Sequence, residues 1–262
     1  MIDVIIPAYN AIDTIEQTLY SIAYQDIVDK INVYIIDDCS SCDYNEIIDF
    51  FSNFMNITFL RLDKNSGPGI ARKYGLINSS NPYIIFIDSD DVFYDAFSIE
   101  RLYNSIKDDK SDLVVSSFVE ETNGDFIVHE KDTIWLHGKI YKRDFLTKYN
   151  INFNDSRANE DNGFNQLIIL CGAKIKYVNF KTYIWCNNKS SITRINNYSN
   201  FYDLFLGYIY NISWALDEAV IRGFKDVGGL AFSALVLIYC HYLFFNDEYK
   251  RLEIINKSKK IK

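Results

Sequence analysis

The N-terminal part of the chain alternates between short apolar runs and segments whose apolar residues recur at helical spacing. The apolar runs cover residues 3–8, 31–36, 57–62 and 83–87, and the helical patterns lie between them. Short apolar runs bounded by turn residues are typical of buried strands, and strands that alternate with helices predict a parallel sheet with crossover helices. We therefore expect an α/β fold with a Rossmann-like, mostly parallel sheet and flanking helices.

Each predicted strand is followed by a polar or turn-forming segment. These segments are residues 7–10, 37–41, 65–69 and 88–91. Ligands of open α/β sheets bind beyond the carboxyl ends of the strands, so we expect the four segments to meet at one binding site. The first strand is followed neither by G-x-G-x-x-G nor by a Walker lysine loop, so the usual signals of dinucleotide and P-loop nucleotide binding are missing.

The most informative of these segments is Asp88-Ser89-Asp90-Asp91, which follows the apolar strand 83–87 directly. Side chains alternate along an extended chain, so Asp88 and Asp90 are expected to point to the same side. Carboxylates at the end of a rigid strand suit Mg²⁺ or Mn²⁺, which can share its other coordination positions with phosphate oxygens. An acidic turn or a helix cap after a core strand is the alternative interpretation.

The charge of the chain restricts its ligands. With 262 residues and a net charge of −8, the chain is not expected to present a broad nucleic-acid-binding face, and an anionic ligand needs a local cation. The five cysteines include one C-x-x-C, Cys39 to Cys42, without a second pair at zinc-site spacing. We interpret them as reduced thiols of a cytoplasmic protein. The first residues lack a basic segment, so no signal peptide is expected.

The pattern changes after residue 110. Strand-like runs follow at 112–118, 125–129, 174–179 and 182–187. A helix is predicted at 142–149, and another begins at Glu160 and Asp161, ahead of an apolar stripe. We divide the chain into residues 1–110 and 111–198, as two halves of one domain, followed by a helical appendage at 199–262.

Residues 227–245 in this appendage contain no Asp, Glu, Lys or Arg. Their length alone suits a membrane span, but glycine, serine, tyrosine and histidine residues dilute the apolar run. We interpret the segment as a buried or dimer-forming helix, with contact to a membrane surface and a true span as alternatives. The basic tail 257–262 is either a solvated terminus or a contact to anionic lipid.

Four segments follow one another in a recognisable order: Val4–Asn10, Ile35–Ser40, Asn65–Arg72 and Ile87–Asp91. In this order they resemble the family 2 glycosyltransferases, which have the GT-A fold. Glu160-Asp161, with Gly138–Tyr141 before it and Ser191–Thr193 after it, resembles the second half of bacterial members. The resemblance covers roughly residues 2–195.

The resemblance implies a pocket for a nucleotide sugar, commonly a UDP-sugar. Pro7, Ala8 and Tyr9 would line the nucleoside pocket, and Asp37 would accept a hydrogen bond from the base. Asp38 is the alternative in that role, or it caps the following helix. Further donor contacts are expected from Asn65, Gly67, Arg72, Asp88, Ser89, Asp90 and Arg194. For two residues an ordinary role stays open, since Arg72 also fits a surface helix position and His137 is interpreted as a plain loop histidine.

The resemblance also implies the chemistry. Asp90, with Asp88 and Asp91 beside it, would bind Mn²⁺ or Mg²⁺, and the ion would neutralise the diphosphate leaving group. Asp161 would be the general base that deprotonates the acceptor hydroxyl while the sugar transfers with inversion, and Glu160 would support it or touch the acceptor. The Q-x-x-R-W signature of processive members is absent, so a single transfer is expected rather than polymerisation.

We therefore expect a cytoplasmic, inverting hexosyl- or N-acetylhexosaminyltransferase, at most peripheral at the membrane, whose acceptor is a glycan, a teichoic-acid-like chain or another polyol. A sugar-nucleotide nucleotidyltransferase is the first alternative. It would normally carry a Gly-rich loop with Arg or Lys after the first strand, which residues 7–10 do not provide. The second alternative is a non-catalytic nucleotide-sugar-binding protein, against which the intact Asp88, Asp90 and Asp161 argue.

Overall fold

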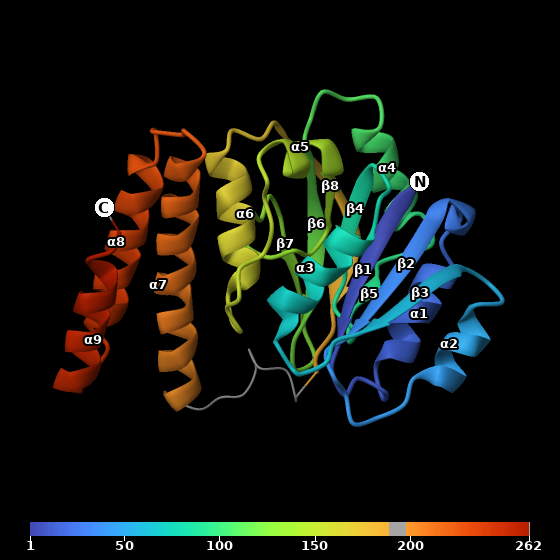
Figure 1. Ribbon diagram of the computed structural model, residues 1–262, viewed down its shortest axis with the longest axis horizontal. Helices are drawn as coiled ribbons and strands as arrows, with labels where there is room; N and C mark the ends of the chain where they lie inside the picture. The colour runs from blue at the N-terminus through green and yellow to red at the C-terminus, as the bar shows by residue number, and fades with distance from the viewer. Residues whose placement is uncertain (189–197, 262) are drawn as a thin grey trace.

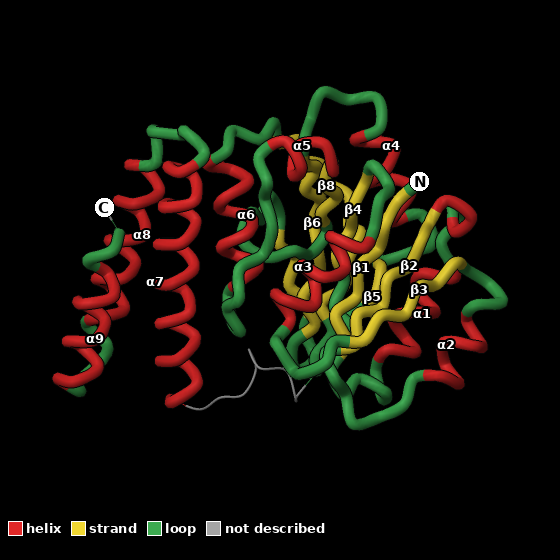
Figure 2. Tube along the Cα trace, in the orientation of Figure 1, coloured by secondary structure: helices red, strands yellow, loops and turns green. Residues whose placement is uncertain are grey.

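One mixed β-sheet forms the centre of the protein, and the computed structural model describes residues 1–188 and 198–261. Within these residues the strand order is β3-β2-β1-β4-β8-β6-β9-β5, and β7 pairs with β6. Figure 2 shows the strands as one twisted layer with helices around it. The α/β class predicted from the sequence is confirmed.

The N-terminal half of the sheet contains the four predicted parallel strands. They are β1 (Ile2–Ala8), β2 (Ile31–Asp37), β3 (Asn56–Arg61) and β4 (Tyr83–Phe86). The crossovers contain α1 (Ile15–Ala23), a short 3-10 turn (Val28–Lys30), α2 (Asn45–Phe51) and α3 (Pro68–Asn78). β1 pairs in parallel with both β2 and β4, so it lies inside the sheet and its ladder is complete on both sides.

Alternate side chains of β1 enter two different cores. Val4 and Ile6 belong to a core that includes α1 and α4 (Ser98–Ile106), whereas Ile5 belongs to a core that includes α3 and α6 (Glu160–Leu170). Burial on both faces explains why β1 is a continuous apolar run. At Gly75 of α3 an added Cβ would lie 2.5 Å from Ile5 Cγ2, so the helix can approach the sheet this closely only with glycine there.

The other half of the sheet is largely antiparallel. It consists of β5 (Val92–Phe93), β6 (Leu113–Glu121), β7 (Phe126–His129), β8 (Lys139–Lys142) and β9 (Ile175–Trp185), with α5 (Arg143–Lys148) after β8. The strand-like runs predicted at 174–179 and 182–187 form one continuous strand, β9, rather than two. The β6–β9 register shifts between Val115 and Phe118. Such an irregularity changes the phase of the side-chain pattern without ending the strand.

Three helices follow at one end of the molecule: α7 (Tyr198–Ile221), α8 (Gly228–Tyr242) and α9 (Glu248–Ser258). Figure 1 shows α6 between α7 and the sheet. α7 approaches α6 closely at Gly163, where an added Cβ would lie 2.7 Å from Asn211 Oδ1. The Asn211 amide also donates hydrogen bonds to Ser156 Oγ and to the Ala158 carbonyl, at 3.0 and 2.9 Å. The appendage is therefore joined to the sheet domain by buried polar contacts.

The apolar segment 227–245 forms α8 and the turn that follows it. None of the helices in the described ranges is long and apolar enough to cross a membrane. Ala234 and Ile238 face the core between the three helices. The opposite face of the segment is open, since Phe232 is 71% and Phe244 is 75% exposed. The interpretation as a buried helix therefore holds for one face only.

Candidate active site

A cavity of about 1150 Å³ lies at the carboxyl ends of the parallel strands. All four polar segments that the sequence placed at this edge contribute to its wall, together with the start of α6. Its lining includes Pro7, Ala8, Tyr9, Asp38, Asn65, Gly67, Arg72, Asp88, Ser89, Asp90, Glu160 and Asp161. Segments far apart in the sequence meet here because the ends of neighbouring strands share one edge of the sheet.

The adjacent acids Asp37 and Asp38 have different surroundings at the end of β2. Asp38 lines the cavity, and its carboxylate accepts hydrogen bonds from the backbone N–H groups of Ser66 and Gly67, both at 2.7 Å. Asp37 is fully buried and forms an ion pair with Arg61. It is not part of the cavity wall. Of the two carboxylates, Asp38 is therefore the one that can meet a ligand in this cavity.

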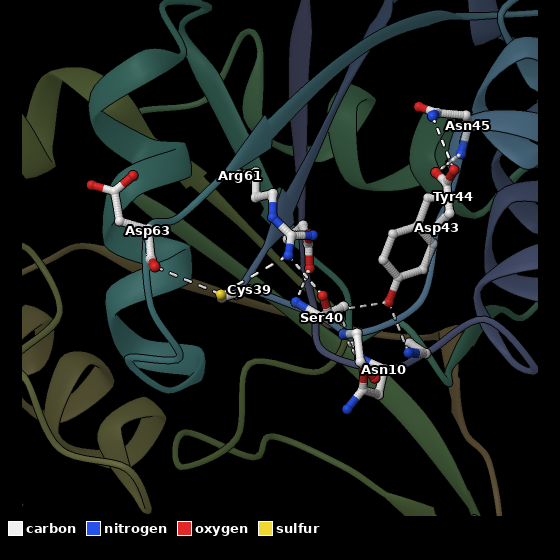
Figure 3. A network of polar contacts seen from close by, with 11 residues as sticks. Asn10, Cys39, Ser40, Asp43, Tyr44, Asn45, Arg61 and Asp63 are labelled. Carbon is white, nitrogen blue, oxygen red and sulfur yellow. Dashed lines mark hydrogen bonds and ion pairs between the residues drawn. The ribbon is translucent and has the colours of Figure 1, made fainter.

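A polar network fixes the loops that follow β1 and β2, as Figure 3 shows. The Tyr44 hydroxyl accepts a hydrogen bond from Ala11 N at 2.8 Å and lies 3.2 Å from Ser40 Oγ. Ser40 Oγ accepts from Asn10 N at 2.8 Å, and Arg61 donates to the Ser40 carbonyl at 2.7 Å. Burial is the main reason that the pKa of Tyr44 is raised to about 12, so its hydroxyl stays neutral. The network holds the loop after β1 against the cavity.

Arg72 on α3 connects two carboxylates from different halves of the chain. Its guanidinium lies 2.5 Å from Asp88 Oδ1 and 2.5 Å from Glu160 Oε1, and its side chain is only 5% exposed. Burial opposes the charge of Arg72, but the two carboxylates raise its pKa above the ordinary value. Burial would also raise the pKa of Asp88, yet Arg72 holds it below its usual value. Arg72 is therefore a buried ion-pair partner and not a surface residue.

The two acids after Asp88 point to different places. Asp90 lines the cavity, and its carboxylate accepts a hydrogen bond from Asn188 Nδ2 at 2.8 Å. Asp91 is buried behind the wall, where it accepts hydrogen bonds from the Tyr183 hydroxyl at 2.5 Å and from Cys186 N at 2.8 Å. Burial and the charges of the neighbouring aspartates raise the pKa of Asp91 well above its ordinary value.

The donor atoms beside β4 fit a divalent cation. One oxygen each of Asp88 and Asp91 and one ring nitrogen of His137 lie within 4.8 Å of one another, and Asp90 faces the same cavity. Carboxylate oxygens are the ligands that Mg²⁺ and Mn²⁺ prefer. Burial lowers the pKa of His137 to about 3, so its ring is neutral. Its buried Nδ1 has no hydrogen-bond partner in the part of the chain that the structure describes.

Asp161 lies in the first turn of α6 and lines the cavity. Burial and the negative charge of Glu160 raise the pKa of Asp161 to about 7, although Arg72 opposes this shift. Asn159, with a positive φ of 58°, forms the left-handed turn from which the helix starts. A carboxylate whose pKa lies near neutral pH is well matched to accept a proton during a reaction.

Sequence reasoning missed a second group of cavity residues. The structure adds Trp135, Arg157, Trp185, Asn188 and Asp203 to the wall, and His137, which the sequence indicated to be an ordinary loop histidine, lines it as well. Arg157 donates hydrogen bonds to Asn65 Oδ1 and to the Asn65 carbonyl, both at 2.8 Å. No spacing rule identifies these residues, because they come from several loops, from the end of β9 and from α7. The predicted donor contact Arg194 lies outside the described residues.

Comparison with known proteins assigns the chain to a family. The family described as glycosyl transferase family 2 matches residues 3–159. The chain therefore belongs to the family 2 glycosyltransferases, which confirms the resemblance read from the sequence.

Curated relatives include two longer proteins of bacteria. Glycosyltransferase GlyA of Streptococcus pneumoniae is 27% identical over 223 residues, which cover 74% of this chain and 32% of GlyA. TarS of Staphylococcus aureus, a poly(ribitol-phosphate) β-N-acetylglucosaminyltransferase, is 27% identical over 202 residues, which cover 71% of this chain and 35% of TarS. This chain thus spans about a third of the length of these relatives.

Solved structures share the fold. The structure of TarS 1–349 with UDP-GlcNAc has a TM-score of 0.68 at 22% identity, covering 88% of this chain and 75% of that one. The mannosyltransferase PcManGT of Pyrobaculum calidifontis, in complex with GDP-Man and Mn²⁺, has a TM-score of 0.61 at 16% identity, covering 99% and 84%. These similarities confirm the GT-A fold.

Proposed function

We propose that this chain transfers a sugar from a UDP-sugar to an acceptor hydroxyl, assisted by a divalent cation and with inversion at the anomeric carbon. One observation carries the proposal: a single cavity combines the strand-end segments suited to a nucleotide with Asp161, a carboxylate whose pKa is raised to about 7. The fold shared with TarS bound to UDP-GlcNAc supports a uridine donor.

The nucleotide half of the donor is assigned to the ends of β1 and β2. Pro7, Ala8 and Tyr9 would contact the nucleoside, and Asp38 would accept a hydrogen bond from the base. Asp37 would act indirectly, since its carboxylate is already paired with Arg61. Asn65 and Gly67 would complete this wall, and Asp88, oriented by Arg72, would contact the ribose or the donor sugar.

Asp88 and Asp90 would hold the cation, because both line the cavity whereas Asp91 lies behind the wall. When bound, the ion supplies Lewis-acid neutralisation of the diphosphate leaving group. His137 supplies a neutral nitrogen next to this position. Asp91 would support the strand end through Tyr183 and Cys186. The Mn²⁺ in the complex of PcManGT supports a cation of this type.

Asp161 would take the acceptor proton. An oxygen of its carboxylate accepts the proton of the acceptor hydroxyl while the new C–O bond forms opposite the departing diphosphate, so the configuration inverts in one displacement. Glu160 is unsuited to this role, because its carboxylate is committed to Arg72 in a buried ion pair. Glu160 instead would position the helix start and raise the pKa of its neighbour.

A product assay separates this function from the alternatives. Purified protein is incubated with UDP-sugars, Mn²⁺ and a mixture of glycan acceptors, and UDP release and glycosylated product are measured. A sugar-nucleotide nucleotidyltransferase would instead release pyrophosphate when it is given UTP and a sugar phosphate as substrates. A non-catalytic binding protein would form neither UDP nor pyrophosphate. Formation of UDP together with a product of inverted configuration supports the proposal.

The surroundings of the enzyme are proposed from two further observations. All five cysteines are free, which supports a reducing compartment such as the cytoplasm.

We also propose that the C-terminal helices bind an anionic membrane surface rather than a second copy of the chain. α8 and the following turn expose Phe232, Leu243 and Phe244. Residues 246–262 then carry six basic residues against three acidic ones in a chain that is acidic as a whole; the basic residues are Lys250, Arg251, Lys257, Lys259, Lys260 and Lys262. Exposed apolar side chains next to basic ones are typical of helices at a membrane surface.

A further inference from the structure

Two tryptophans, Trp135 from a loop and Trp185 from the end of β9, lie together in the cavity wall. The rings of Trp135 and Trp185 are 5.7 Å apart between centroids, at an interplanar angle of 41°. His137 lies against both of them, with centroids 6.3 Å from Trp135 and 5.2 Å from Trp185. All three side chains line the cavity that also contains Asp90 and Asp161. The two indoles therefore form an aromatic wall beside the proposed site of chemistry.

The buried side chain of Lys139 holds the loop that carries Trp135. The Lys139 side chain is fully buried, and its ammonium donates hydrogen bonds to the carbonyls of Trp135 at 2.5 Å and His137 at 3.4 Å, and to Asp132 Oδ1 at 3.3 Å. Burial lowers the pKa of Lys139 to about 8, although Asp132 opposes this shift. The three hydrogen bonds of the buried Lys139 ammonium fix the backbone of the loop. The position of Trp135 is therefore set before any ligand binds.

The same loop is tied to the helix that carries Asp161. Asn165 lies one helical turn after Asp161, and its amide donates hydrogen bonds to the carbonyls of Ile134 at 2.8 Å and Trp135 at 2.9 Å. The Tyr141 hydroxyl donates to Asn165 Oδ1 at 2.8 Å, which fixes the orientation of that amide. Residues four apart share one face of a helix. Asn165 therefore sets the distance between the aromatic wall and the proposed base.

The charge of the cavity restricts what this wall can bind. Seven carboxylates line the cavity within the described ranges: Asp13, Asp38, Asp88, Asp90, Glu160, Asp161 and Asp203. The arginines of this lining are Arg72, which is shared by two carboxylates, and Arg157, which is bound to Asn65. The neutral His137 adds no positive charge. A divalent cation offsets two negative charges, but the donor diphosphate adds a similar negative charge, so the cavity stays acidic with both bound. A polyanionic acceptor would therefore be repelled here.

We propose that Trp135 and Trp185 form the acceptor subsite, and that they bind an uncharged pyranose ring whose attacking hydroxyl faces Asp161. This inference rests on the proposed function. The C–H face of a pyranose is apolar and matches the flat indole surface, while its ring hydroxyls can reach the carboxylates of the wall. An acyclic polyol phosphate, the acceptor named for TarS, has no such face and carries the disfavoured charge. This chain would thus differ from TarS in its acceptor class.

Binding measurements test the subsite independently of turnover. Maltotetraose, cellotetraose, chitotetraose and an oligomer of ribitol phosphate are titrated into the intact protein with UDP and Mn²⁺, and calorimetry and tryptophan fluorescence report binding. We expect saturable binding of at least one neutral sugar and none of the phosphate oligomer. Trp135→Ala should weaken the sugar at least about tenfold, Trp135→Phe should restore part of the loss, and neither should change UDP affinity. Tyr24→Ala, at an aromatic side chain that is 74% exposed and outside the cavity lining, is the matched control.

The outcomes separate the two proposals. Preference for the phosphate oligomer, absence of binding to every neutral sugar, or unchanged sugar affinity in Trp135→Ala would overturn the acceptor subsite. Weakened UDP binding in Trp135→Ala would also overturn it, because the indole would then belong to the donor site. UDP release from UDP-sugars in the presence of the bound neutral sugar is measured in parallel. Its absence, with sugar binding intact, counts against the proposed transfer reaction and leaves the subsite standing.

Discussion

Arg72 and Glu160 stand 88 positions apart in the sequence, yet their side chains form a buried ion pair of 2.5 Å. The pair joins α3, beside the nucleotide-binding edge, to the first turn of α6. The pair also gives the adjacent acids Glu160 and Asp161 different properties. Glu160 is ion-paired with Arg72, whereas Asp161 next to it has a pKa raised to about 7 by burial and by the charge of Glu160.

Removing Arg72 should destabilise the protein and weaken donor binding together. In Arg72→Met the carboxylates of Asp88 and Glu160 lose a shared buried partner, and breaking a buried ion pair typically costs about 3–5 kcal/mol. Urea unfolding should therefore show a loss of at least about 3 kcal/mol. Arg101→Met is the control, because Arg101 is 37% exposed and pairs with Asp95 at the surface, where such pairs contribute about 1 kcal/mol or less. Equal unfolding midpoints for the two variants would refute the structural role of Arg72.

Replacement of the proposed base should remove chemistry and spare binding. Asp161→Asn keeps the shape of the side chain but cannot accept a proton, and general bases typically contribute about 10²–10⁴-fold. Transfer should fall at least about a hundredfold, while UDP-sugar affinity by calorimetry should stay unchanged. Asp203→Asn, at another acid of the cavity wall, should stay within a few-fold of normal turnover. Near-normal turnover of Asp161→Asn with saturating acceptor would exclude it as the base, and Glu160→Gln would be tested next.

The rate should also depend on pH through Asp161. Its pKa is about 7, raised by burial and by Glu160, and below its pKa the carboxyl is protonated and cannot accept the acceptor proton. The transfer rate should therefore rise with pH and level off, falling about tenfold per unit below the inflection. A cation at Asp88 and Asp90 would lower this pKa, so the inflection should lie at about 7 or below. A flat profile between pH 5 and 8, measured with saturating substrates, would contradict the assignment.

Removal of the cation should weaken donor binding strongly. The cavity is acidic, so the diphosphate meets net repulsion without a metal ion. Calorimetry should show that UDP affinity falls at least about tenfold when EDTA replaces Mn²⁺, and Asp90→Asn in Mn²⁺ should produce a similar loss. Asp13→Asn, which removes another acid of the cavity lining, should instead leave the Mn²⁺ dependence intact. Equal UDP affinity in EDTA and Mn²⁺ would remove the metal from the mechanism.

The C-terminal helices should direct the protein to anionic vesicles. Co-sedimentation with vesicles that contain phosphatidylglycerol should exceed that with pure phosphatidylcholine, and added salt should reduce it, because the basic residues act through charge. A double variant, Phe232→Ser with Phe244→Ser, should lose most of this binding and keep its fold, since both side chains are more than two-thirds exposed. A stable dimer in analytical ultracentrifugation that the double variant dissociates would show that a second copy covers this face instead.

The sequence by itself determined the alternation of strands and helices. It also determined the edge of the sheet at which the cavity lies and the acidic residues that line it. Apolar runs such as 83–87 are local signals, because a strand buried on both faces must be continuously apolar. Strand ends in a parallel sheet lie at one edge, so the convergence of Tyr9, Asp38, Gly67 and Asp90 followed from the order of elements alone. The position of Asp161 in the first turn of α6 was equally local, since it depends on helical periodicity.

Only the tertiary structure decided which of these side chains face the cavity and with what charge. The Asp37 carboxylate pairs with Arg61, and the Asp91 carboxylate accepts a hydrogen bond from Tyr183. The Trp135 carbonyl accepts hydrogen bonds from Lys139 and Asn165, which hold Trp135 in the cavity wall. Such partners are set by packing between distant elements, which no periodicity encodes. The pKa of Asp161 depends in the same way on burial and on nearby charges. Sequence spacing predicts where an acid stands along the chain, but the three-dimensional arrangement of partners and solvent decides whether it pairs, binds a cation or accepts a proton.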